Sequence, residues 1–151
     1  MHASAAGVDR ETKIKQVEDG DVSVRDYGKY LPIGNAPQKI SAWHKQGAEI
    51  VYLTSRRKVE EIAAIKQVLD HYGFPEGKLE FRGGTENYGE VAVRIKPDII
   101  IEDDCESIGG RKEMIYPKLP KMAKQDIVSI VVKEFQGIDH LPDDINKLKV
   151  G

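Results

Sequence analysis

The chain has 151 residues, a length that suits a single domain with one hydrophobic core. Its composition is 40% hydrophobic and 32% charged with no long polar tract, which excludes an intrinsically disordered chain. The formal net charge is −2, and the lysines and arginines are spread among the acids, so nothing in the charge pattern favours nucleic acid or a membrane surface as a partner.

Cysteine content and hydropathy indicate the environment of the protein. The single cysteine, Cys105, cannot form an intramolecular disulfide, which fits a reducing cytoplasm. No apolar run approaches the ~20 residues of a membrane-spanning helix, and residues 1–11 lack the apolar core of a signal peptide. We therefore expect a soluble, cytoplasmic protein.

The first 35 residues mix short polar and apolar stretches and end in the turn formers Gly34, Asn35 and Pro37. They predict a peripheral, partly helical segment, whereas residues 36–151 form the core of the same single domain. The predicted core elements, in chain order, are a helix from Ala36 to Gly47, a strand over 49–53, a helix ending at Gly73, a strand over 78–82, a helix beginning near Thr85 or Asn87, a strand over 99–102 and a strand over 126–135.

Continuously apolar strands that alternate with amphipathic helices are typical of a parallel sheet covered on both faces. The sequence therefore predicts a doubly wound, Rossmann-like α/β fold with three layers, α/β/α. In such sheets ligands bind beyond the carboxyl ends of the strands. The residues that close the four predicted strands are Thr54 and Ser55, then Arg82, then Glu102, Asp103 and Asp104, then Lys133 and Glu134.

These strand ends combine three chemical groups at one edge of the sheet. A hydroxyl at the start of a helix can hold a phosphate oxygen, which assigns phosphate binding to Thr54 and Ser55. A neighbouring guanidinium, Arg82, can neutralise a second oxygen. Consecutive acids at a buried strand end repel one another, so we expect a cation there, and Asp103 with Asp104 suit Mg²⁺.

Three features of the chain resemble the second, third and fourth motifs of the haloacid dehalogenase-like (HAD) superfamily: the run YLTSR, a later basic residue and the run DIIIEDD. The resemblance covers roughly residues 36–140. Most members of that superfamily are Mg²⁺-dependent phosphatases. The resemblance implies that Thr54 binds the phosphoryl group and acts in catalysis with a basic residue, and that Asp103 and Asp104 bind Mg²⁺. Arg82 has the best strand-end position for the basic residue, with the alternatives Lys96 and Lys78.

The superfamily's first motif, a hydrophobic strand ending in Asp-x-Asp-x-Thr that supplies the nucleophile, is not found in this chain. VEDGDVS offers Asp19, Asp21 and Ser23 at the right spacing, but TKIKQ before it is too charged for a central strand. The first residues look like those that follow the first motif. We therefore expect phosphomonoester hydrolysis only from a form with an upstream first motif, and an inactive chain as it stands.

Two other functions stay open. A non-catalytic HAD-like module would bind a phosphorylated ligand or a protein partner, and the sheet edge left by the absent strand would allow a homodimer. A nucleotide-binding protein of another doubly wound family is disfavoured, because no glycine-rich loop follows the first strand.

The same residues also have purely structural explanations. Thr54 and Ser55 are good helix N-caps, and Asp103 and Asp104 can cap a turn. Arg82 can pair with Glu80 or Glu86 at the surface. Acidic neighbours disfavour Cys105 as a nucleophile because they raise the pKa of a thiol.

Overall fold

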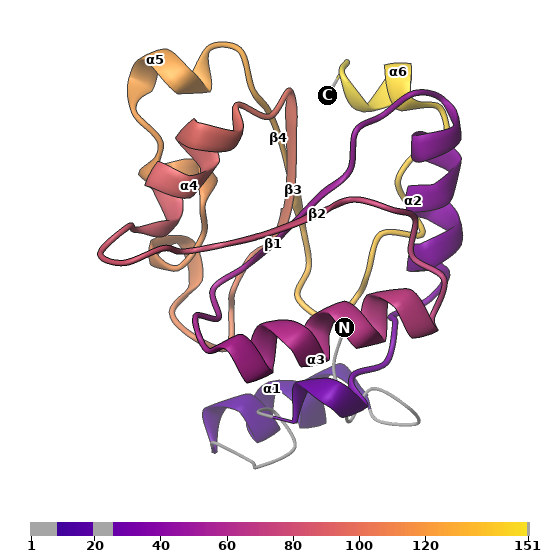
Figure 1. Cartoon of the computed structure of the whole chain (residues 1–151), viewed down its shortest axis with the longest axis vertical. Coiled ribbons are helices and arrows are strands. Elements are labelled where there is room, and N and C mark those ends of the chain that lie inside the picture. Colours follow the sequence, from indigo (N-terminus) through magenta and orange to yellow (C-terminus); the bar gives the residue numbers. More distant parts are fainter. Residues whose placement is uncertain (1–8, 20–25, 151) are drawn as a thin grey trace.

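The computed structural model describes residues 9–19 and 26–150 of the chain (Figure 1). The helices in these ranges are α1 (Arg10–Glu18), α2 (Ala36–Lys45), α3 (Val59–His71), α4 (Tyr88–Ile95), α5 (Lys121–Lys124) and α6 (Ile145–Leu148). The strands are β1 (Val51–Thr54), β2 (Lys78–Phe81), β3 (Ile99–Asp103) and β4 (Val128–Val132), and the short 3₁₀ helices are η3 (Tyr27–Lys29), η4 (Gly110–Lys112) and η5 (Tyr116–Lys118).

The four strands form two parallel pairs. β1 pairs with β2 from Val51 opposite Lys78 onward, and β3 pairs with β4 from Ile99 opposite Val128 onward. Within the described ranges no ladder joins one pair to the other. The predicted mixed α/β class with parallel strands is thus confirmed, but the strands form two two-stranded sheets where the sequence predicted one continuous sheet.

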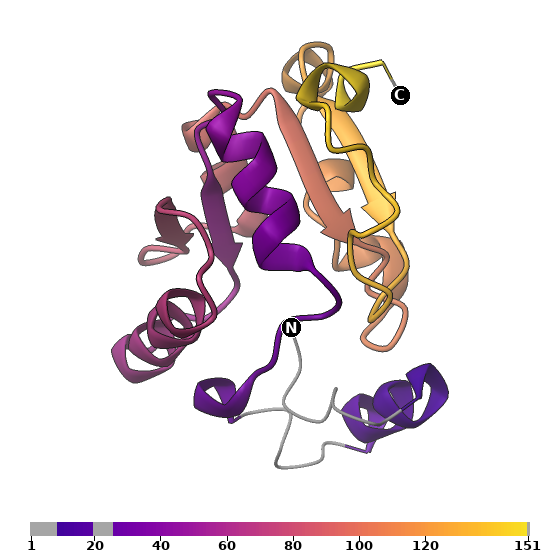
Figure 2. The same cartoon turned by 90° about the vertical axis from the view of Figure 1, so that its right-hand side faces the viewer.

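Helices lie on both sides of the strands. Figure 1 shows α2 on one side and α4 on the other, and Figure 2 shows α2 passing in front of the space between β1 and β3. The apolar stripe of α4 is fully buried at Val91 and Ala92, and Ala92 packs in one cluster with Ile100 of β3 and with Leu119. Trp43 of α2 is buried as well, as a large aromatic side chain on an amphipathic helix should be.

Local hydrogen bonds set the beginning of α4. The Asn87 side chain accepts from the Glu90 N–H at 3.0 Å, and the Glu90 carboxylate accepts from the Asn87 N–H at 2.7 Å, which together form a capping box. Of the two predicted caps, Asn87 is therefore the correct one and Thr85 is not. The helix ends before Pro97, where Lys96 takes a left-handed conformation with φ 53°.

The cap predicted for the helix after β1 is wrong. α3 begins only at Val59, with Lys58 in the N-cap position, so neither Thr54 nor Ser55 caps it. Residues 55–58 instead form a short irregular link between β1 and α3.

Segments from both ends of the chain pack onto this arrangement. The C-terminal segment attaches to α2, where the Trp43 indole N–H donates to the Pro142 carbonyl at 2.9 Å and the Gln46 amide donates to the Asp143 carbonyl at 2.8 Å. α1 lies across the carboxyl ends of β3 and β4 (Figure 2). Among the described residues, no helix has the length and apolar content to cross a membrane.

We predict that Asn87→Ala lowers the free energy of unfolding by about 1 kcal/mol, because the N–H groups at the start of α4 lose their cap. Urea denaturation followed by circular dichroism measures the change. The matched control is Asn146→Ala, at an exposed helical position whose side chain makes no hydrogen bond in the described structure; we expect a change within about 0.5 kcal/mol there. Equal effects of the two substitutions would contradict the role of the capping box.

Candidate functional site

The ends of β1 and β2 meet around Arg82. Its Nη2 donates to the Ser55 carbonyl at 3.3 Å, and its guanidinium carbon lies 5.6 Å from the centroid of the Tyr88 ring. The Nε of Arg82 is buried and has no hydrogen-bond partner within the described part of the chain. The structure therefore brings Ser55 and Arg82 together and leaves one guanidinium donor without an acceptor.

The surface ion pairs expected for Arg82 belong to another residue. Arg94 on α4 contacts both acids, with Nη1 3.0 Å from Glu80 and Nε 3.1 Å from Glu86. Arg94 therefore makes the ion pairs that the structural explanation assigned to Arg82, and the contacts of Arg82 among the described residues are with Ser55 and Tyr88.

Tyr88 is a member of this cluster that the sequence did not indicate. Burial raises the pKa of its phenol, and a hydrogen bond to the Ser55 side chain and the nearby charges of Arg56 and Arg82 offset part of that rise. Cys105, which follows β3, lies near enough to raise the same pKa slightly. An aromatic residue at the first position of a helix reads as core packing, so no local signal marked it.

Thr54 ends β1 and faces a turn instead of a helix terminus. Its hydroxyl oxygen accepts from the Arg56 N–H at 3.2 Å. The hydroxyl hydrogen can still be donated to a ligand. Because α3 begins at Val59, the predicted phosphate site at a helix start next to Thr54 and Ser55 is not formed.

The first acid at the end of β3 has a structural partner. Both carboxylate oxygens of Glu102 accept backbone N–H groups, from Ile115 at 2.6 Å and from Tyr116 at 2.9 Å. These bonds hold the segment that leads into η5 against β3. Glu102 therefore stabilises the connection to β4.

The next two acids also bind backbone groups. One oxygen of Asp103 accepts the Cys105 N–H at 2.8 Å. One oxygen of Asp104 accepts the N–H groups of Glu134 at 3.2 Å and Glu106 at 3.4 Å, and the other lies 3.6 Å from the Lys133 ammonium. The turn-capping explanation is thus correct for both. The second oxygen of Asp103 has no partner among the described residues, and Asp103 is exposed.

The Mg²⁺ that the resemblance implies can be tested against these donors. The described residues contain no group of three or more His, Cys, Asp or Glu side chains placed to hold a metal ion. Mg²⁺ usually takes one or two carboxylates and completes its shell with water and phosphate oxygens. Asp103 fits such a ligand through its free oxygen, whereas Asp104 fits only if its contact with Lys133 is lost.

Parts of the N-terminal segment lie against the same edge. Arg10 of α1 donates through Nε to the Glu134 carbonyl at 3.2 Å and forms an ion pair with Glu106. On the other side, the guanidinium of Arg56 lies 5.2 Å from the centroid of the Tyr27 ring in η3. The segment that the sequence placed at the periphery therefore reaches the strand ends, and Arg10 is a contact that no local pattern predicted.

The alternative nucleophile motif is described only in part. Asp19 follows α1 and is exposed, so it does not close a strand. Asp21 and Ser23 lie outside the described residues.

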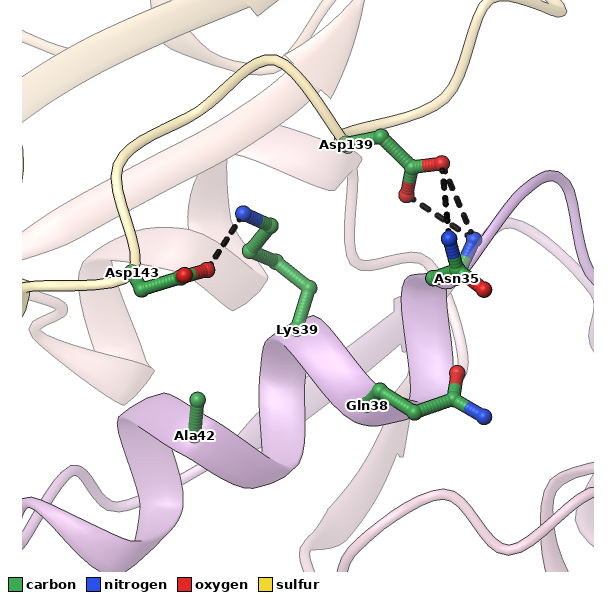
Figure 3. Close-up of a pocket in the computed structure, with 6 residues that line it drawn as sticks. All are labelled: Asn35, Gln38, Lys39, Ala42, Asp139 and Asp143. Carbon is green, nitrogen blue, oxygen red and sulfur yellow. Dashed lines mark hydrogen bonds and ion pairs between the residues drawn. The ribbon is translucent and has the colours of Figure 1, made fainter.

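A surface pocket of about 360 Å³ lies between α2 and the C-terminal segment (Figure 3). Its polar groups bind one another: the Asp139 carboxylate accepts the Asn35 N–H at 2.9 Å, and the Lys39 ammonium contacts Asp143 and the Leu141 carbonyl. None of the predicted site residues lines it. The pocket therefore belongs to the attachment of the C-terminal segment.

Comparison of the chain with protein-family models, with curated proteins and with solved structures finds no match. The function is accordingly inferred from the residues at the strand ends.

We predict that the Cys105 thiol reacts slowly. Burial, and next the charge of Asp103, raises its pKa to about 12 from an ordinary value of 9.0, which leaves roughly a thousandfold fewer thiolates at pH 8. Alkylation by iodoacetamide, followed by mass spectrometry, should be at least about tenfold slower in the folded chain than in urea, since the higher pKa that reduces the thiolate fraction also makes each thiolate more nucleophilic. Asp103→Asn should speed it up. Equal rates in the folded and unfolded chain would contradict the environment assigned to Cys105.

Proposed function

We propose that this chain is the core of a HAD-like phosphohydrolase and that the carboxyl ends of its strands bind the phosphoryl group of a phosphomonoester. In this proposal the two strand pairs are halves of one doubly wound sheet in a three-layer α/β/α fold. The parallel direction within each pair and the helices on both sides support it. The hydroxyls, the guanidinium and the carboxylates at the ends of β1, β2 and β3 also support the proposal.

The unpartnered Nε of Arg82 carries the proposal. A buried donor on a charged group needs an acceptor, and leaving it unpaired costs about 1–3 kcal/mol or more. An anionic oxygen is the strongest acceptor for a guanidinium. A phosphoryl group bound beside Ser55 and Arg82 would supply that acceptor once the Arg82 side chain turns its buried Nε toward the ligand, and the Tyr88 ring would pack against the guanidinium.

Each residue then has a defined task. The Thr54 hydroxyl donates its hydrogen to one phosphoryl oxygen, and Arg82 neutralises a second. Asp103 would hold Mg²⁺ with its free oxygen, and a bound Mg²⁺ would supply further charge neutralisation at the phosphate. The sequence contains no Asp-x-Asp-x-Thr to attack phosphorus. We therefore expect this chain to bind a phosphomonoester without hydrolysing it.

We predict that Arg82→Gln weakens the binding of inorganic phosphate, measured by isothermal titration calorimetry with Mg²⁺ present, by about 10- to 100-fold, the equivalent of one hydrogen bond to a charged group. The matched control is Arg94→Gln, which removes a guanidinium that pairs with Glu80 and Glu86, and we expect it to leave the dissociation constant unchanged. Unfolding in urea confirms that both variants fold. No phosphate binding by the unmodified chain, or equal losses in both variants, would refute the phosphate site.

We also predict that the chain does not turn over p-nitrophenyl phosphate in the presence of Mg²⁺, whereas a longer version would do so if the gene encodes an Asp-x-Asp-x-Thr strand upstream. Release of p-nitrophenolate measures both. Turnover by the chain itself that survives Asp19→Asn combined with Asp21→Asn would show that another nucleophile is present. Phosphate binding without turnover of any phosphomonoester by the longer version would favour the second candidate, a non-catalytic phosphate-binding module.

A further inference from the structure

Four cations gather where β1 and β2 end. Three of them, Arg56, Arg57 and Lys58, form most of the link between β1 and α3, and the fourth, Arg82, follows β2. None of the four has an ion-pair partner among the described residues. The acids on β2 and in the loop after it pair with Arg94 instead. Since the formal net charge of the whole chain is −2, this edge carries a local excess of positive charge.

Arg57 fixes the position of this link. Its Nη1 donates to the Gly84 carbonyl at 3.0 Å, and its Nη2 donates to the Glu86 carbonyl at 3.3 Å. These bonds tie the link after β1 to the loop after β2, which lies between Arg82 and Tyr88 in the chain. The two segments that carry the guanidinium groups of this edge are therefore held side by side.

The Arg56 side chain, in contrast, binds no carbonyl or carboxylate in the described part of the chain. Its guanidinium carbon lies 5.2 Å from the centroid of the Tyr27 ring, whereas its backbone N–H donates to the Thr54 hydroxyl oxygen at 3.2 Å. Burial raises the pKa of the Tyr88 phenol, and the charges of Arg56 and Arg82 are among the influences that offset part of that rise. Both guanidinium groups therefore act on the same phenol.

Arg56 and Arg82 together suit a ligand with more than one anionic group. Two like charges near one phenol repel each other, and an anion that contacts both removes that cost. Arg82 is already assigned to a phosphoryl oxygen, which leaves the Arg56 donors for another anion. The Tyr27 ring restricts the Arg56 guanidinium before any ligand binds, so less conformational entropy is lost when the anion arrives. A planar guanidinium binds phosphate or carboxylate through two parallel N–H groups.

We infer that the site takes a phosphomonoester with a second anionic group, either a phosphate or a carboxylate, and that Arg56 binds this group. The inference rests on the proposed phosphate site and adds the class of its substrate. Because Arg56 directly follows Ser55, whose carbonyl accepts from Arg82, the second anion lies within a few atoms of the phosphoryl group. A monoester whose other end is neutral leaves the Arg56 guanidinium without an acceptor, so it binds more weakly.

Isothermal titration calorimetry with three ligands tests the inference, with Mg²⁺ present as in the phosphate titration. Ethyl phosphate carries the phosphoryl group alone, whereas carboxymethyl phosphate adds a carboxylate and ethylene glycol bisphosphate adds a phosphate at the other end. We expect at least one of the two-anion ligands to bind at least about tenfold more tightly than ethyl phosphate, the equivalent of one charge-assisted contact. The tighter of the two identifies the second anion. Arg56→Gln should reduce this preference to less than about threefold, whereas Arg82→Gln should weaken the binding of all three ligands.

Lys58→Gln is the matched control, because it removes the same charge from the same link at a side chain without a contact in the described structure. We expect it to change the preference by less than about twofold, and unfolding in urea confirms that every variant folds. Equal binding of all three ligands would overturn the inference and leave the phosphate site standing. Equal losses of preference in Lys58→Gln and Arg56→Gln would also overturn it, because a long-range field would then explain the preference. No binding of any ligand would overturn the phosphate site as well.

Discussion

The requirement that each peptide group of a strand finds a hydrogen-bond partner governs this structure. β1 meets it through β2, and β3 meets it through β4, but each does so along one edge only. The half-burial of two apolar strands follows directly, since no strand lies between them in the described chain. The division of the strand ends into two groups follows as well: hydroxyl and guanidinium groups close β1 and β2, and carboxylates close β3.

Backbone donors, more than cations, stabilise the acids that follow β3. Glu102 binds two N–H groups of the segment before η5, and Asp104 binds the N–H of Glu134 beyond β4. The Lys133 ammonium lies near Asp104, and Arg10 pairs with Glu106, so the cations are side chains of the protein itself. All three consecutive acids accept backbone N–H groups and so fix the loops at this edge, and one oxygen of Asp103 has no partner among the described residues.

The sequence predicted the elements well where local forces decide them. Apolar periodicity located α2, α3 and α4, and residue type narrowed the start of α4 to Thr85 or Asn87, of which the capping box of Asn87 and Glu90 selects Asn87. The predictions failed where a contact joins distant residues. Tyr88 reaches Ser55, and Arg10 reaches Glu106 and Glu134, through packing that no local pattern encodes. Thr54 and Ser55 were misread as caps because the irregular link before α3 lengthens the turn.

The sequence by itself determined the α/β class, the order of α2–α4 and the four strands, and the chemical groups at each strand end, because side-chain periodicity and composition are properties of short segments. The tertiary structure alone decided which edge of each strand is paired, which carboxylate oxygens are already bonded and which guanidinium donor lacks an acceptor. These outcomes depend on hydrogen bonds between residues far apart in the chain, such as Glu102 with Ile115 and Asp104 with Glu134, whose geometry exists only once the segments have packed.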